Sequence, residues 1–142
     1  MLMLRAEIGQ HIPHSGRMCL LDGLLEWDPE RIVCVAHSHH AADNPLRREG
    51  QLRAVCGIEY AAQAIALHGS LTASAEPGTR VGYLASVRDL VCRVALLDEV
   101  PGRLRISAER LLAERARAIY AFRICADDQE LMQGRAAVVL AG

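Results

Sequence analysis

The stretch that decides the fold is Gly57-Ile58-Glu59-Tyr60-Ala61-Ala62-Gln63-Ala64-Ile65-Ala66-Leu67-His68, where a carboxylate interrupts an alanine-rich, nearly all-apolar helical pattern. An ionised carboxylate is costly to bury, so a buried one is paired, hydrogen-bonded or kept protonated. The protonated state is the one that a general acid needs, which makes Glu59 the first catalytic candidate. The structural alternative is that Glu59 lies at a polar helix edge and bonds Gln63 one turn later.

The helical pattern extends over residues 52–71, and Gly69 near its end is a typical helix stop. Helical rise gives this segment a length of roughly 30 Å, the breadth of a small domain. Because the segment is apolar on nearly every face, other elements must enclose it.

Segments with strand character lie on both sides of this helix. Residues 18–27 and 31–38 are joined by Asp28-Pro29-Glu30 and predict a hairpin, followed by an irregular polar stretch at 39–51. After the helix, turn-like residues separate four predicted strands at 80–94, 103–113, 116–126 and 130–140. Residues 111–118 also suit a helix on propensity, but the prediction is strand. The order predicts an α+β fold, an antiparallel sheet wrapped around one long central helix.

The size and charge of the chain exclude several classes of protein. Its 142 residues suit a single domain, residues 1–142, and a formal net charge of −1 gives no footprint for nucleic acid or an anionic membrane. No apolar run reaches the ~18 residues of a membrane span, and no signal-peptide pattern precedes the first element, so we expect a cytoplasmic protein. The five cysteines lack metal-ligand spacing, which predicts buried free thiols.

Four short motifs, in their order along the chain, resemble the hotdog-fold β-hydroxyacyl-acyl-carrier-protein dehydratases. They are Ile12-Pro13-His14, Met18-Cys19-Leu20-Leu21-Asp22, Glu59-Tyr60-Ala61-Ala62-Gln63 and Gly82-Tyr83-Leu84-Ala85. The likeness spans most of the chain, and it is greatest to the divergent predicted dehydratases found beside aryl-polyene-type lipid synthesis genes. The order and spacing of the motifs together carry the assignment.

The resemblance implies a homodimer, or a heterodimer with another hotdog subunit, in which two sheets join edge to edge and the active sites lie at the interface. It implies no cofactor, because the substrate is a 3-hydroxyacyl thioester carried on the phosphopantetheine of acyl carrier protein. In the family reaction a His takes the proton α to the thioester carbonyl, and the helix carboxyl, here Glu59, protonates the departing β-hydroxyl. A helix amino end suits this chemistry because its N–H groups stabilise an enolate-like oxygen, and Gly57 would let the thioester approach closely.

The sequence departs from the family pattern at the base. The family His lies in a His-Phe-Pro-Gly loop ahead of the helix, and that register falls here on Asn44-Pro45-Leu46-Arg47. Asn44 is therefore the counterpart, and an amide is no base at neutral pH. Three alternatives stay open: His39 or His40 acts as the base, a partner subunit supplies it, or the chain binds acyl carrier protein without catalysis. A thioesterase on the same fold, with Glu59 activating water, is a further alternative.

Three more side chains are candidates for the site. Gln63 shares a helix face with Glu59 and is expected either to fix the orientation of its carboxyl or to bond across an interface. His14 matches the family Pro-His and is expected to be an orienting hydrogen-bonder. Tyr83 is expected on a buried strand, either in the core or lining the acyl channel.

Arginines near the start of the helix suit an anionic group. Arg47, with Arg48 and Arg53, is predicted to bind a phosphopantetheine phosphate or an acidic carrier surface, the alternative being a solvated charge patch. His37 and His39 would share a strand face, but no nearby carboxylate or Cys completes a ligand set, so no metal site is expected.

Overall fold

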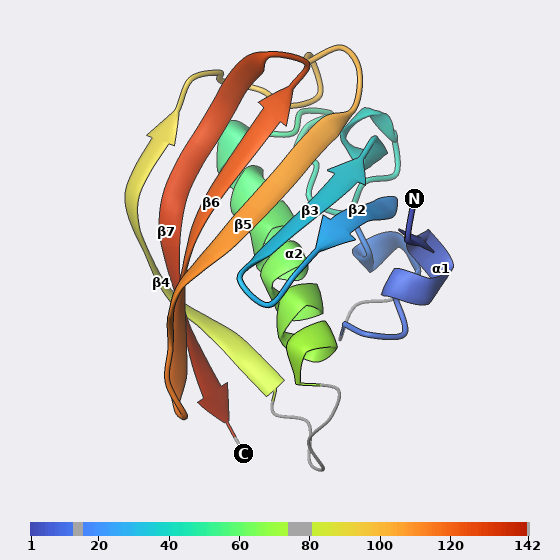
Figure 1. Ribbon diagram of the computed structural model, residues 1–142. Coiled ribbons are helices and arrows are strands. Elements are labelled where there is room, and N and C mark those ends of the chain that lie inside the picture. The colour runs from blue at the N-terminus through green and yellow to red at the C-terminus, as the bar shows by residue number, and fades with distance from the viewer. Residues whose placement is uncertain (13–15, 74–80, 142) are drawn as a thin grey trace.

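A computed structural model describes residues 1–12, 16–73 and 81–141 of the chain. Within these residues a seven-stranded antiparallel sheet curves around helix α2, with strand order β1-β2-β3-β5-β6-β7-β4 (Figure 1). The strands are β1 (Met3–Leu4), β2 (Gly23–Trp27), β3 (Arg31–Ala36), β4 (Val81–Cys92), β5 (Leu104–Ala113), β6 (Arg117–Ala126) and β7 (Gln129–Ala141). The helices are α1 (Arg5–Ile8) and α2 (Gly57–Thr72), with 3₁₀ turns at Gly16–Met18, Ser38–His40 and Ala54–Cys56. The prediction of an antiparallel sheet around one long helix is confirmed.

The strands after α2 follow the predicted pattern of alternating side chains. On β5, Leu104 and Ile106 are fully buried against the helix, whereas Arg105 points to the outer face. The ambiguous segment 111–118 is not helical: β5 continues to Ala113, residues 114–116 form a tight turn, and β6 begins at Arg117. In this turn Glu114 N–H donates to the Arg117 carbonyl at 2.8 Å, and Arg117 Nε–H donates to the Glu114 carboxylate at 2.7 Å.

The first hairpin is shorter than predicted. Strand β2 begins only at Gly23, because Met18 and Leu20 bond to the helix instead of to the sheet. Leu20 N–H donates to Gln63 Oε1 and Gln63 Nε2–H donates to the Met18 carbonyl, each at 2.8 Å. The apolar run from residue 18 therefore lies against α2 before it enters the sheet.

Helix α2 begins later than predicted, at Gly57 instead of residue 52. Leu52 N–H donates to Asp98 Oδ1 at 2.8 Å, and the Leu52 carbonyl accepts from Leu97 N–H at 2.7 Å. These bonds to the β4–β5 connection use Leu52 outside the helix, so regular turns start only after the 3₁₀ turn Ala54–Cys56.

Close packing against the sheet determines which residue can start the helix. A Cβ on Gly57 would clash with Met132 Sδ and lie 3.0 Å from Ile124 Cδ1. Gly57 thus lets the first turn of α2 pack on β6 and β7. The resemblance predicts that this glycine admits a thioester, but the sequence does not indicate its role in core packing. Further along the helix, Tyr60, Leu67 and His68 are fully buried beneath the sheet.

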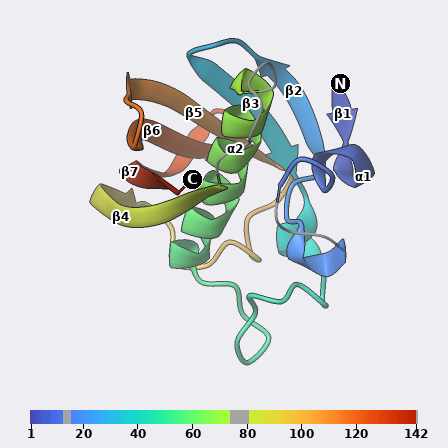
Figure 2. The same cartoon turned by 90° about the horizontal axis from the view of Figure 1, so that it is seen from below.

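Strand β4 is one of the two edge strands of the sheet, and within the described residues it pairs only with β7 (Figures 1 and 2). Its register shifts twice, between Leu84 and Ser86 and between Arg88 and Val91. The expectation that Tyr83 lies on a buried strand is wrong for this chain alone, because its side chain is 59% exposed beside an unpaired edge. The described strand β4 thus leaves one row of backbone groups and several apolar side chains open.

Candidate active site

Glu59 lies in the first turn of α2 and is exposed. The expectation of a buried carboxylate is therefore wrong for the isolated chain. The helix buries the side that faces β3, β5 and β6, and Glu59 projects from the opposite stripe, which continues through the half-buried alanines Ala62 and Ala66. A carboxylate in the first turn is favourably placed at the positive end of the helix dipole.

Gln63 does not orient the Glu59 carboxyl. Its side chain is only 1% exposed, and both ends of the amide are used by the backbone of Met18 and Leu20. The side chain attaches the segment before β2 to the helix. Its place one turn after Glu59 in the sequence does not give it a role beside the carboxylate.

Asn44, at the register of the family His, belongs to a buried hydrogen-bond network. Its Nδ2–H₂ group donates to the Ser38 carbonyl at 2.9 Å and to Tyr60 Oη at 3.1 Å, while its Oδ1 accepts from Leu46 N–H at 2.9 Å. Ser38 Oγ lies 2.9 Å from Tyr60 Oη and donates to the Leu20 carbonyl at 2.7 Å. Burial raises the pKa of Tyr60. The network holds residues 39–51, the polar segment between β3 and α2, against the helix.

His39 and His40 are both engaged with one backbone oxygen. The Nε2 atoms of His39 and His40 lie 3.2 and 2.6 Å from the Val100 carbonyl, so in each ring Nε2 carries the proton. His39 is fully buried, and burial, followed by the neighbouring His40, lowers its pKa to about 4. Its Nδ1 is buried with no hydrogen-bond partner in the described part of the chain. His39 is therefore a weak base that is shielded from solvent.

Arg47 is used within the polar segment. Its guanidinium donates to the carbonyls of Ala41 at 2.8 Å, Gly50 at 2.7 Å and His39 at 3.1 Å, and it lies 3.8 Å from Asp98 Oδ2. These contacts leave Arg47 little capacity for a phosphate. The contacts of Arg47 in the structure are internal to the chain and do not support its predicted role in substrate binding.

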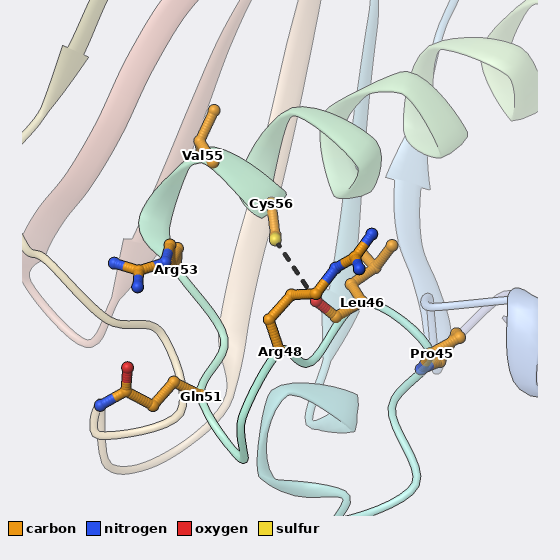
Figure 3. Close-up of a pocket in the computed structure, with 7 residues that line it drawn as sticks. All are labelled: Pro45, Leu46, Arg48, Gln51, Arg53, Val55 and Cys56. Carbon is orange, nitrogen blue, oxygen red and sulfur yellow. Dashed lines mark hydrogen bonds between the residues drawn. The ribbon is translucent and has the colours of Figure 1, made fainter.

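Arg48 and Arg53 are exposed at a pocket of about 300 Å³ beside the amino end of α2 (Figure 3). The remaining lining residues are Pro45, Leu46, Gln51, Val55 and Cys56. No ion pair engages either arginine in the described residues. Of the three arginines, these two are the ones able to meet an anionic group at this end of the helix.

Thiol chemistry is disfavoured at this site. Burial raises the pKa of the Cys56 thiol, which lines the pocket, and raises that of Cys34 to about 12. A thiol must ionise to act as a nucleophile. The expectation of buried thiols holds for Cys19 and Cys34, whereas Cys92 is exposed at the end of β4.

The remaining candidates from the sequence are His14 and the histidines considered for a metal site. His14 falls outside the described residues. No group of three or more His, Cys, Asp or Glu side chains in residues 1–12, 16–73 and 81–141 is arranged to hold a metal ion. None of the helices described has the length and apolarity that crossing a membrane requires.

Sequence reasoning missed the residues that organise this end of the helix. Ser38, Tyr60 and the Val100 carbonyl hold Asn44 and the two histidines in place. Tyr60 was visible beside Glu59, but a tyrosine in an apolar helix reads as core. The role of a backbone carbonyl as a hydrogen-bond acceptor cannot be predicted from the residue type, because every residue has one.

Comparisons with known proteins agree with this architecture. The family model described as ApeP dehydratase, of the ApeP-like family, matches residues 6–141. The dehydratase heterocomplex ApeI:P from Xenorhabdus doucetiae contains a chain with a TM-score of 0.84 at 20% identity, covering 95% of this chain and 91% of that chain. No curated protein sequence matches.

Two thioesterase structures share the same hotdog fold at lower similarity. A mutant of thioesterase PA1618 from Pseudomonas aeruginosa has a TM-score of 0.64 at 13% identity, covering 99% of this chain and 96% of that chain. A hypothetical thioesterase from Streptococcus pneumoniae, solved with coenzyme A, has a TM-score of 0.63 at 11% identity, with 84% of each chain covered. The structural likenesses show the fold, and the family model, which covers nearly all of the sequence, shows that the chain belongs to the ApeP-like dehydratase family.

Proposed function

We propose that this chain acts in the dehydration of 3-hydroxyacyl thioesters on acyl carrier protein, with Glu59 as the general acid and a partner hotdog subunit as the source of the base. One observation carries the proposal. Glu59 is an exposed carboxyl at the amino end of α2, while His39 and His40 ahead of it are bound to the Val100 carbonyl. The two histidines that the sequence offered as the base are thus held by a backbone carbonyl, while the acid is exposed.

The proposed step balances as an elimination. An imidazole of the partner takes the proton from the carbon next to the thioester carbonyl, and the released electron pair forms the Cα–Cβ double bond. The Cβ–O bond breaks while Glu59 gives its proton to the leaving oxygen, so the products are an enoyl thioester and water. Negative charge that develops on the thioester oxygen is stabilised by N–H groups at the amino end of α2.

A partner subunit would also suit the acid. A general acid must hold its proton when substrate arrives, and a subunit that covers Glu59 would disfavour the ionised carboxylate by excluding water. Strand β4, whose outer edge is unpaired in the described residues, also contacts α2, the helix that carries Glu59. The ApeI:P structure is a heterocomplex of dehydratases, which supports a non-identical hotdog partner for this chain.

The test is to incubate the protein with 3-hydroxyacyl carrier protein and with enoyl carrier protein, and to follow mass changes by intact-protein mass spectrometry. Each substrate is offered to the chain alone, to a hotdog subunit that retains the His-Phe-Pro-Gly loop (the loop-His subunit) alone, and to the mixture of the two. The proposal predicts loss or gain of water only in the mixture. Release of free acid would indicate a thioesterase instead, and a mixture no faster than the loop-His subunit alone would indicate a non-catalytic partner.

A further inference from the structure

Two arginines lie directly opposite one another at the open edge of the sheet. Arg88 on β4 and Arg135 on β7 are register partners, and both are exposed. They share the outer face, because Gly134 and Ala136 on either side of Arg135 are buried beneath the sheet. Like charges at directly opposite positions are destabilising, so the chain tolerates a repulsive pair here.

Among the described residues, little negative charge lies near this pair. Glu109 is in the same cross-strand row but is separated from Arg135 by Ala121, and its register partner on the far side is Arg31. Glu130 is already bound by Arg93 and Arg123, at 2.8 and 2.7 Å.

The carboxylate nearest in sequence is Asp89, at the positive-φ position of a register shift in β4. No ion pair joins it to Arg88 in the residues that the structure describes. The edge therefore carries the guanidinium groups of Arg88 and Arg135 and the carboxylate of Asp89, which leaves it with a net positive charge.

The same edge is apolar enough to need a partner. Exposed large apolar side chains gather on β4 and the adjacent end of β7: Tyr83, Leu84, Leu90, Val91 and Val139. Tyr83 and Val139 are register partners and form an exposed aromatic and β-branched pair. An open edge strand with apolar side chains is a template for pairing with another chain.

A second copy of this chain fits the edge poorly. If two β4 strands paired antiparallel about a twofold axis near the middle of Val81–Cys92, both Arg88 residues would fall close to the axis. At strand spacing their Cα atoms would be roughly 10 Å apart, which is near the screening length at physiological salt. Each copy would also bring its own Arg135, so four guanidinium groups would meet on one face.

We propose that Arg88 and Arg135 select the occupant of the β4 edge, favouring a different chain that places carboxylates over this pair and disfavouring a second copy of this one. This inference rests on the partner subunit in the proposed function, and it names the chemistry by which that partner is chosen. Repulsion at an interface is a common means of excluding the wrong partner.

The test measures association without any activity assay. The double variant Arg88→Glu/Arg135→Glu is mixed with the wild-type chain, and mixed dimers are quantified by sedimentation velocity and by native mass spectrometry. Opposite charges then face one another, so the mixed dimer should form roughly tenfold more tightly than the wild-type homodimer at low salt. The gain should disappear at 1 M salt, where the screening length falls to about 3 Å.

The control is Arg105→Glu, which reverses an exposed arginine of the same outer face on β5, away from the β4 edge. It should give no mixed-dimer gain. The proposal is overturned if the wild-type chain self-associates as tightly as the mixture, or if the control behaves like the double variant. Should the double variant fail to fold, Arg88→Gln/Arg135→Gln removes the repulsion alone and should strengthen self-association. Absence of dehydratase activity leaves all these association results interpretable, so the two proposals fail separately.

Discussion

The polar segment between β3 and α2 and the edge strand β4 differ in how many of their hydrogen bonds and apolar contacts are made within the chain itself. In the segment, Asn44 and Arg47 are bonded to the surrounding backbone and side chains. On β4, one side of the strand is unpaired within the part of the chain that the structure describes, and Tyr83 is largely exposed. Residues that look catalytic in sequence can thus be internal supports, while a strand that looks like core can be an interface.

The contrast is tested most strongly at Arg47. Arg47→Ala removes donors from three carbonyls and breaks the contact with Asp98. We expect a loss of about 2–4 kcal/mol in the free energy of unfolding, because three carbonyls lose their donors, two of these bonds being partly buried. Its neighbour Arg48 is exposed and forms no ion pair with the other residues that the structure describes, so Arg48→Ala should change stability by less than about 0.5 kcal/mol. Urea denaturation of both variants measures the difference, and equal losses would contradict the assignment.

The second prediction concerns pH. The pKa of His39 in the folded protein, about 4, lies below its unfolded value, so the unfolded state binds more protons in between. The contribution of His39 to the free energy of unfolding is therefore complete above about pH 6.5. It is lost as the pH falls toward 4, and the loss is on the order of 3 kcal/mol at most. Burial lowers the pKa of His68 as well, so it adds to the same trend.

The pH dependence is checked by chemical denaturation between pH 4 and 7.5. His39→Gln should flatten the dependence, whereas His11→Gln, at an exposed position, should leave it as it is in the wild type. A flat wild-type profile would show that His39 titrates normally.

A third prediction separates two glycines of the same helix. Gly57→Ala should destabilise the fold by about 1–3 kcal/mol, because the added Cβ meets Met132 and Ile124. Gly69→Ala meets nothing within 4 Å and should stabilise the helix by up to about 1 kcal/mol. Thermal unfolding of the pair provides the measurement. Two shifts of the same sign would mean that the first turn packs differently.

The smallest effect on stability is expected at the edge. Tyr83→Ser removes an exposed side chain and should change the free energy of unfolding of the monomer by less than about 0.5 kcal/mol. The same variant should weaken association with a hotdog partner, since exposed aromatics are typical interface anchors. Unfolding in urea and sedimentation of the mixture report the two effects. A large loss of monomer stability would place Tyr83 in the core after all.

Most of the fold was predictable because it depends on periodicity. Alternating residues such as Leu104 and Ile106 mark the buried face of a strand, and the apolar helix had to be enclosed. The start of the helix was predicted too early, because the bonds of Leu52 to Asp98 and Leu97 connect parts of the chain that are far apart in sequence.

The candidate site was less predictable. Spacing placed Gln63 on the face of Glu59, but the bonds of its amide to Met18 and Leu20 depend on tertiary packing. The exposure of Glu59 was missed because an all-apolar helix implies burial by the chain itself. An apolar surface that a partner subunit covers has a residue composition similar to that of a protein core.

The most direct measurement of the central claim is the rate of water loss from 3-hydroxyacyl carrier protein in the mixture with a loop-His subunit, compared between Glu59→Gln and Glu26→Gln. Glu26 is an exposed carboxylate on β2 and serves as the matched control. General acid catalysis by Glu59 predicts a loss of roughly 10²- to 10⁴-fold for Glu59→Gln and an unchanged rate for Glu26→Gln. A mixture that dehydrates equally fast with Glu59→Gln would contradict the account.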